Sequence, residues 1–221
     1  MKWYRSSLGF IGLFAFLACT QPRKKEKVSR VATLPYYVDA SFTPKWINPK
    51  SLDTLKIHQV PSFELINQLG DSIDERTFED KIYVTDFFFT SCPGICPKMT
   101  NNMLLVQKEF EADEEVLLLS HSVTPDYDSV PILKHYADTK GVIPNKWHLV
   151  TGKRKDIYNL GRNGYFVEED LGVPKGEDDF LHTENFILVD RNKHIRGIYN
   201  GLNKTAIAQL IADIKTLKKE E

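Results

Sequence analysis

Residues 81–110 constrain the fold of this chain more than any other segment, because they join a buried strand to a helix through two cysteines. Residues 81–89 read KIYVTDFFF, an apolar run typical of a strand that is buried on both faces of a sheet. Residues 97–110 carry apolar side chains at helical spacing and begin with Pro97, which suits the first turn of a helix because it has no N–H to leave unpaired. Cys92 and Cys96 are therefore expected in a strand-to-helix turn.

Strands and helices alternate through the rest of the chain. This alternation predicts an α/β domain with a central mixed sheet flanked by helices and an N-terminal strand extension. A long polar segment is expected to interrupt the pattern before the last two strands. The predicted strands cover residues 36–38, 42–47, 58–65, 115–120, 147–150, 185–190 and 194–199, the polar segment 163–181, and the other helices 128–139, 154–159 and 203–218.

The N-terminus has the pattern of an export signal. A short basic region precedes 11 apolar residues, 8–18, whereas a membrane-spanning helix needs roughly 20. The run ends at Leu17-Ala18-Cys19, which resembles the lipobox of bacterial lipoproteins, where the cysteine becomes the lipid-modified first residue. We therefore expect a lipoprotein-type signal peptide over residues 1–19, a polar tether over 20–35 and the folded domain over 36–221. The lipid on Cys19 would hold the domain at a membrane of the cell envelope, on the periplasmic side; an uncleaved apolar anchor or simple secretion are the alternatives.

Composition excludes two classes of protein, nucleic-acid-binding proteins and disulfide scaffolds. The formal net charge is −1, so the chain lacks the basic excess expected of a nucleic-acid-binding protein. A chain of 221 residues with three cysteines is large enough to bury a core without disulfides and too poor in cysteine to be a disulfide scaffold. The function must therefore come from particular residues.

The two mid-chain cysteines have the character of a metal or redox site. The first turn of a helix carries unpaired N–H groups and partial positive charge, which stabilise a thiolate. Two thiolates four residues apart can chelate a soft metal such as copper or zinc, or close into a disulfide. His182, just before a predicted strand, supplies a third ligand if the topology brings it close. A set of two cysteines and one histidine can hold both Cu(I) and Cu(II).

Four segments in order resemble the Sco (SenC) family of copper proteins over roughly residues 55–217. They are residues 92–97, CPGICP, for the family's CxxxCP motif; residues 122–126, SVTPD, for its SVDPxxD-like segment; residues 147–152, WHLVTG; and His182. Thr124 departs from the family, which has Asp there. The resemblance implies a thioredoxin fold with inserted elements, copper bound by Cys92, Cys96 and His182, and support of copper A assembly in cytochrome c oxidase.

Two functions follow from this resemblance. The first is a metallochaperone that passes copper to an oxidase subunit or another acceptor by ligand exchange. The alternative is an enzyme, a thiol–disulfide reductase that keeps the acceptor's copper-ligand cysteines reduced by cycling Cys92 and Cys96. A third hypothesis is a redox or copper sensor. His182 distinguishes the first two, since only the chaperone depends on it.

Asp86 is an unusual carboxylate inside the predicted strand 81–89. Thioredoxins resemble this arrangement in placing a buried Asp at the matching distance from their cysteines, where it assists proton transfer. Burial raises the pKa of a carboxyl group, so Asp86 is expected to tune the protonation of Cys92 and Cys96. A strand-end Asp with a local hydrogen bond is the alternative. The five other histidines are interpreted as structural. Among them His121 is singled out, because it ends a predicted buried strand that could point towards the site.

Overall fold

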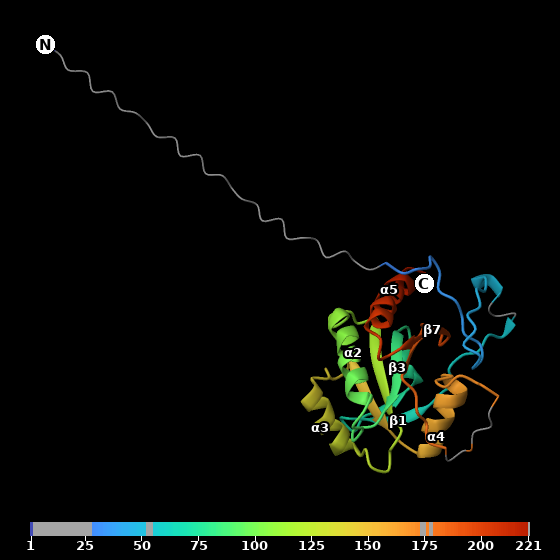
Figure 1. The fold of residues 1–221 in the computed structure, drawn as a ribbon, viewed down its shortest axis with the longest axis vertical. Helices are drawn as coiled ribbons and strands as arrows, with labels where there is room; N and C mark the ends of the chain where they lie inside the picture. Colours follow the sequence, from blue (N-terminus) through green and yellow to red (C-terminus); the bar gives the residue numbers. More distant parts are fainter. Residues whose placement is uncertain (2–27, 52–54, 173–175, 177–178, 221) are drawn as a thin grey trace.

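A seven-stranded mixed sheet forms the centre of the domain, with the strand order β2-β1-β5-β4-β3-β6-β7 (Figure 1). The computed structural model describes residues 1, 28–51, 55–172, 176 and 179–220. The strands are β1 (Glu64–Asn67), β2 (Ser72–Asp74), β3 (Ile82–Phe88), β4 (Val116–Ser122), β5 (Trp147–Thr151), β6 (Asn185–Val189) and β7 (Ile195–Asn200). The helices are α2 (Cys96–Glu109), α3 (Val130–Lys140), α4 (Arg154–Asn159) and α5 (Lys204–Glu220), with short 3-10 or π turns η1 (Pro49–Ser51), η2 (Glu75–Phe78) and η3 (Leu160–Gly164).

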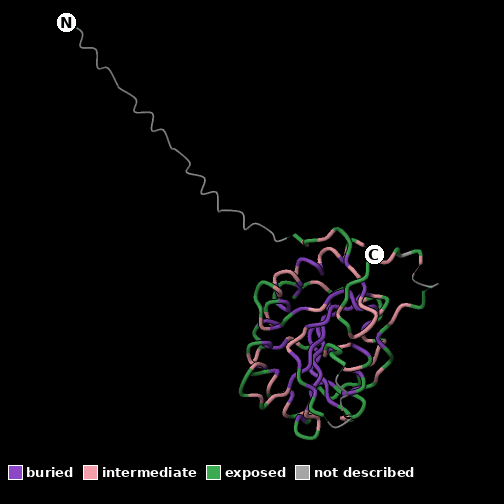
Figure 2. Tube along the Cα trace, turned by 45° about the vertical axis from the view of Figure 1, so that its right-hand side comes forward, coloured by how far each residue is buried: buried purple, intermediate pink, exposed green. Residues whose placement is uncertain are grey.

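The predicted α/β class is confirmed, and the central strands explain why the sequence signals it so clearly. β3, β4 and β5 are parallel neighbours, and every residue of β3 and β4 is buried. Strands covered on both faces have apolar residues at nearly every position. The buried chain accordingly runs through the middle of the molecule between exposed outer segments (Figure 2).

Two hydrophobic clusters cover the two faces of this sheet. One contains Met99 and Met103 of α2 and Leu210 of α5, while the other contains Ile157 of α4 and Leu65 of β1. The amphipathic pattern predicted for the last helix is confirmed, since the predicted apolar positions of α5 are largely buried. The layers thus leave the strand ends, rather than the sheet faces, available for a site.

The predicted strand over residues 58–65 is largely wrong. Residues 58–63 form no strand, and β1 begins only at Glu64, where it pairs with the unpredicted β2. Pro61 has no N–H to give to a ladder, and the preceding Val60 instead donates its N–H to Lys193 O. The N-terminal extension is likewise reduced to two isolated bridges, Tyr36 with Lys45 and Tyr37 with Ile195.

Residues 34–37, called here the strap, belong to the folded core, although residues 34 and 35 fall within the predicted tether. Leu34 is only 1% exposed. Its carbonyl accepts a hydrogen bond of 2.8 Å from the Arg196 guanidinium, and its N–H donates to the carboxylate of Glu220. The core therefore extends to the N-terminal side of the predicted boundary at residue 36.

The strap and the cysteines occupy opposite ends of the sheet. Val189 of β6 pairs with both Tyr83, near the start of β3, and Ile195, the first residue of β7. Ile195 accepts the N–H of Tyr37 in the strap, whereas the cysteines follow the other end of β3. We call that other end, where β3 ends at Phe88 and β6 begins at Asn185, the cysteine end. The first described residues before the strap accordingly lie beside the C-terminal end of α5 (Figure 1).

Apart from Met1, the predicted signal peptide with the lipidation site Cys19 lies outside the described residues, as do residues 20–27 of the predicted tether. Within the described ranges, no helix combines the length and the apolar character needed to cross a membrane.

Candidate metal and thiol site

Cys92 and Cys96 lie in the turn between β3 and α2, as the sequence predicts. Cys92 is half-buried, and Cys96 is only 4% exposed because it is the first residue of α2 and packs into the core. Both are free thiols. Pro97 stands in the first turn of the helix, so the nearby unpaired N–H groups face the turn that carries the sulfurs.

The surroundings of the two thiols push their pKa values in opposite directions. Burial raises the pKa of Cys92, but hydrogen bonds from the backbone of Cys96, Gly94 and Ile95 and from the Cys96 thiol outweigh it, so the net pKa is lowered. Burial raises the pKa of Cys96 to about 12. Cys92 therefore loses its proton more readily than Cys96, and the Cys96 thiol donates a hydrogen bond that favours the Cys92 thiolate.

Asp86 lies at the fifth of the seven positions of β3, six residues before Cys92, so the strand-end interpretation is wrong. It is buried and accepts a hydrogen bond from the Ser120 hydroxyl of β4, which in turn accepts one of 2.8 Å from Trp147 Nε1. Burial raises the pKa of Asp86 to about 7, against the opposing effect of the Ser120 hydrogen bond. The charge of Asp86 is one of the causes that raise the pKa of Cys96, so the carboxyl group and the inner thiol interact electrostatically.

His182 is exposed and lies at the cysteine end of the sheet. Its neighbours Leu181 and Thr183 are both buried, and Thr183 Oγ1 donates to Val167 O at 2.7 Å. Two residues before His182, the ring of Phe180 packs edge-on against Phe89, with 5.6 Å between centroids. The topology thus brings the His182 segment beside the strand end that precedes Cys92, which the sequence pattern alone does not establish.

The three predicted ligands are not gathered into one coordination sphere in this conformation. Among the described residues, no group of three His, Cys, Asp or Glu side chains is close enough to hold an ion. The two sulfurs form a preassembled pair, and His182 stands apart at the same end. The ligand set Cys92, Cys96 and His182 therefore stays a prediction.

The remaining histidines have structural surroundings. His121 is fully buried, its Nδ1 lies 3.1 Å from Thr85 Oγ1, and its ring stacks on Phe87 with 4.6 Å between centroids. Burial lowers the pKa of His121 to about 3, so the ring is neutral at physiological pH. His148 and His194 are also buried, His58 bonds Gly164 O, and His135 is exposed on α3.

Asp128 is a site-forming residue that the sequence pattern marks only as the start of a helix, although it stands at the last position of the SVDPxxD-like segment that begins at Ser122. It is fully buried just before α3. Its carboxylate accepts hydrogen bonds from Thr90, two residues before Cys92, and from Ser122 and Thr124. The cluster of Ser, Thr and Asp around Pro125 is the available sequence signal, because such side chains commonly bond within a turn.

Arg162 in η3 is a residue that sequence reasoning missed. Its guanidinium donates to Gly176 O at 2.9 Å and to Asp179 O at 2.5 Å, and it forms an ion pair with Glu168 at 3.4 Å. It also lies over the ring of Tyr158. Arg162 thus fastens the segment that leads to His182 against the body of the domain.

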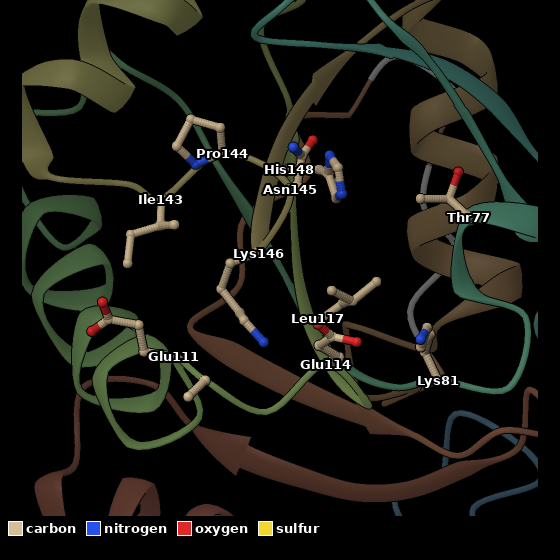
Figure 3. Close-up of a pocket in the computed structure, with 11 residues that line it drawn as sticks. Thr77, Lys81, Glu111, Glu114, Leu117, Ile143, Pro144, Asn145, Lys146 and His148 are labelled. Carbon is tan, nitrogen blue, oxygen red and sulfur yellow. The ribbon is translucent and has the colours of Figure 1, made fainter.

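A groove of about 490 Å³ lies away from the cysteines, near the starts of β4 and β5 (Figure 3). Leu117, Lys146 and His148 line it. Lys146 Nζ is already used by the carbonyls of Asp113 and Val116, and His148 Nδ1 lies 3.3 Å from Asn67 Nδ2. These two polar side chains are engaged in holding the fold, and the groove lies at the start of β4, away from the two thiols, so the cysteine end remains the candidate site.

Comparisons with known proteins give the relatives of this chain and of its fold. The family model described as SCO1/SenC matches residues 53–219. The SCO1 protein homolog of Bacillus subtilis (strain 168) is 29% identical over 161 residues, which cover 72% of this chain and 82% of the relative. The crystal structure of a SCO1/SenC family lipoprotein from Bacillus anthracis str. Ames is 30% identical, with a TM-score of 0.63 over 73% of this chain and 95% of that one.

Two further solved structures are similar to this chain. BsSco, described as a member of the Sco family of cytochrome c oxidase assembly proteins in which a disulfide switch was identified, is 29% identical with a TM-score of 0.62, covering 74% and 95% of the two chains. The copper-bound ScoI of Bradyrhizobium japonicum is 21% identical with a TM-score of 0.56, covering 72% and 99%. At that identity the last comparison shows a shared fold alone.

Proposed function

This chain belongs to the SCO1/SenC family, and from that premise we propose that it is a copper metallochaperone. It binds copper through Cys92, Cys96 and His182 and delivers it to, or prepares, the copper A site of cytochrome c oxidase during assembly. The observation that carries the proposal is the free sulfur pair at the start of α2, in which the pKa of Cys92 is lowered. Thiolate and imidazole are the donors that copper prefers in both oxidation states.

The unequal burial of the donors suits delivery of copper as a cargo. Cys96 is buried and fixed by the helix, while Cys92 is half-buried and His182 is exposed. An acceptor's ligands can therefore replace His182 and Cys92 first, and Cys96 would be the last ligand to release the copper. Ligand exchange of this kind in a docked encounter requires no chemical turnover.

The same thiols support a second function, that of a thiol–disulfide reductase. Cys92 has the exposure and lowered pKa of an attacking thiolate, and Cys96 has the buried position of a resolving thiol. Attack by Cys92 on an acceptor disulfide forms a mixed disulfide and releases one acceptor thiolate. Cys96, after losing its proton, then attacks Cys92, so that the acceptor leaves as a dithiol and Cys92–Cys96 becomes the disulfide. The disulfide switch described for BsSco favours keeping this candidate.

We place the protein in the cell envelope, attached to a membrane through a lipid on Cys19, with its domain on the periplasmic side. The lipobox-like Leu17-Ala18-Cys19 supports this proposal, as does the similarity to a SCO1/SenC family lipoprotein. Its partner is then the copper-binding subunit of the oxidase or another copper acceptor at the same membrane.

Anaerobic copper titration of the full-length protein tests the leading proposal. The decisive variant is His182→Ala, and His135→Ala is its matched control because it removes an exposed imidazole on α3. We expect one tightly bound copper per chain, and Cu(II) should show thiolate-to-copper charge-transfer absorption that only His182→Ala loses. Weak binding that does not depend on His182, together with ready thiol–disulfide exchange, would assign the protein as a reductase instead.

A further inference from the structure

We propose that Asp128 is the positioning residue of the cysteine turn: its carboxylate fixes Thr90 and thereby the orientation in which Cys92 meets its ligand or disulfide partner. The inference rests on the proposed function only in so far as copper is that ligand. No atom of Asp128 needs to touch copper or an acceptor for this role.

Asp128 joins two chain segments that flank the site. Thr90, between β3 and Cys92, donates its hydroxyl to Oδ1 at 2.5 Å and its backbone N–H to Oδ2 at 3.2 Å. On the other side, Ser122 Oγ and Thr124 Oγ1 donate to Oδ2 at 2.6 Å and 3.0 Å. One buried carboxylate thus ties the start of the cysteine turn to the segment that follows β4.

These hydrogen bonds are strong determinants of position because the carboxylate is fully buried. A buried donor or acceptor that loses its partner cannot bond to water instead. The arrangement in which every hydrogen bond is made is therefore strongly preferred. All four donors are neutral O–H or N–H groups. Their directions, rather than a neighbouring opposite charge, decide where Thr90 lies.

The later part of the cysteine turn is held by other contacts: Cys92 and Ile95 pack against the core cluster, and Ile95 O accepts the N–H groups of Lys98 and Met99. Ser91, Pro93 and Gly94 are exposed, so they contribute little packing. The backbone hydrogen bond within the turn, from Cys92 N–H to Phe89 O, measures 3.3 Å, beyond the usual range for such bonds. The Thr90–Asp128 hydroxyl contact is shorter and ends on a fully buried carboxylate, so it is the strong contact at the start of the turn, just before Cys92.

Two substitutions break the contact from opposite sides, and two controls match them. Thr90→Val removes the hydroxyl while keeping the shape, and Thr90→Ser restores it. Asp128→Asn replaces one acceptor oxygen with an N–H donor, and Asp126→Asn removes the same charge from an exposed position two residues away. Near-UV circular dichroism identifies the variants that fold, and Thr90→Val decides the matter if Asp128→Asn does not.

The full-length protein is measured in two ways. The first is copper affinity, by anaerobic competition with a chelator. The second is the ratio of the alkylation rates of Cys92 and Cys96 in the metal-free dithiol form, which does not depend on copper. We expect Thr90→Val and Asp128→Asn to weaken copper binding about tenfold, the size of one well-formed buried hydrogen bond. Both should also lower the rate ratio, while Thr90→Ser and Asp126→Asn retain the parent values.

The outcomes separate this inference from the proposed function. Folded Thr90→Val and Asp128→Asn variants with the parent rate ratio and the parent copper affinity would overturn the role of Asp128. A parent protein that binds no copper would overturn the metallochaperone proposal. In that case a lowered rate ratio in the two variants would still support Asp128 as the positioning residue, and an unchanged ratio would reject it.

Discussion

Asp86 and Ser120 occupy paired positions of the parallel strands β3 and β4, and the Ser120 hydroxyl donates a hydrogen bond to the Asp86 carboxyl group. Trp147 of β5 donates to the same hydroxyl oxygen, so one hydrogen-bonded chain crosses three strands of the sheet. Both Ser120 and Trp147 are buried with Asp86. This chain holds a titratable group inside the core, where its protonation affects both stability and the nearby thiol.

The stability of the protein is expected to fall as the pH rises through the range in which Asp86 differs between its two states. The pKa of Asp86 is about 7 in the folded protein and about 3.9 in an unfolded chain. Between these values the folded state keeps a proton that the unfolded state has released, so the free energy of unfolding decreases with pH. The full effect is at most about 4 kcal/mol, of which about 2–3 kcal/mol falls between pH 5 and 8.

Asp86→Asn removes this titration and keeps an oxygen for Ser120. Urea unfolding at pH 5 and pH 8 should therefore show a smaller loss of stability in the variant than in the parent. Asp80→Asn, at an exposed position before β3, should leave the parent's pH dependence in place. Equal pH dependence in the parent and Asp86→Asn would contradict the raised pKa. Unchanged thiol reactivity and copper affinity in Asp86→Asn would remove the proposed tuning of the cysteines.

Cys92 is expected to react with iodoacetamide well before Cys96 in the reduced, metal-free protein. Cys92 is the more exposed thiol and its pKa is lowered, while burial raises the pKa of Cys96 to about 12. The thiolate is the reactive form, so at pH 7.5 we expect the rates to differ by more than about tenfold. Peptide mass spectrometry after short labelling times measures both sites and separates them from Cys19. Faster labelling of Cys96 would reverse the assigned order of attack.

Arg162→Ala is expected to loosen the segment that leads to His182. The substitution leaves the carbonyls of Gly176 and Asp179 without the guanidinium that they accept. Arg154→Ala is the matched control, because Arg154 also lies over the Tyr158 ring and no hydrogen bond joins it to residues 176–182 among the described contacts. Hydrogen exchange in residues 176–182 should rise about 5- to 150-fold in Arg162→Ala and not in Arg154→Ala, because about 1–3 kcal/mol is lost with the charge-assisted hydrogen bonds. Equal exchange in the two variants would argue against this anchoring role.

Leu34→Ala is expected to destabilise the domain by about 2–3 kcal/mol, since the lost side chain leaves a cavity in the core. The matched control is Val28→Ala in the same N-terminal region, because Val28 is 81% exposed. Thermal unfolding of the full-length variants should lower the midpoint for Leu34→Ala and leave it unchanged for Val28→Ala. A Leu34→Ala variant as stable as the parent would show that the strap is not part of the cooperative core.

The sequence predicts the elements whose signals are local and continuous. β3 and β4 can be recognised from their continuous apolar runs, and the start of α2 from Pro97. These signals predict the element boundaries to within a few residues. β2 is three residues long with Ser and Asp at its ends, so neither length nor alternation marks it. It forms a strand because it pairs with β1 in the folded domain, and this tertiary contact outweighs its weak local preference.

The candidate site likewise has a part that the sequence predicts and a part that it does not. The cysteine turn follows from its motif, whereas the contacts that position it join residues far apart in the chain. Thr90 and Asp128 are 38 residues apart, and Leu34 and Arg196 are 162 apart. Side-chain hydrogen bonds over such separations leave no periodic signal in the sequence. The placement of His182 at the cysteine end likewise follows from the antiparallel pairing of β6 with β3, which the pattern of residues does not specify.

The strap also decides how a mechanical load would enter the domain. A pull on the chain before residue 34 is taken up by the hydrogen bonds of Leu34 with Arg196 and Glu220, and by that of Tyr37 with Ile195. All of these contacts lie on β7 and α5, at the edge of the sheet and at the end opposite the cysteines, with β6 between β7 and β3. Tension on the N-terminus is therefore resisted outside the strand and helix that hold Cys92 and Cys96. The two sulfurs can therefore keep their geometry while the N-terminal segment is under tension.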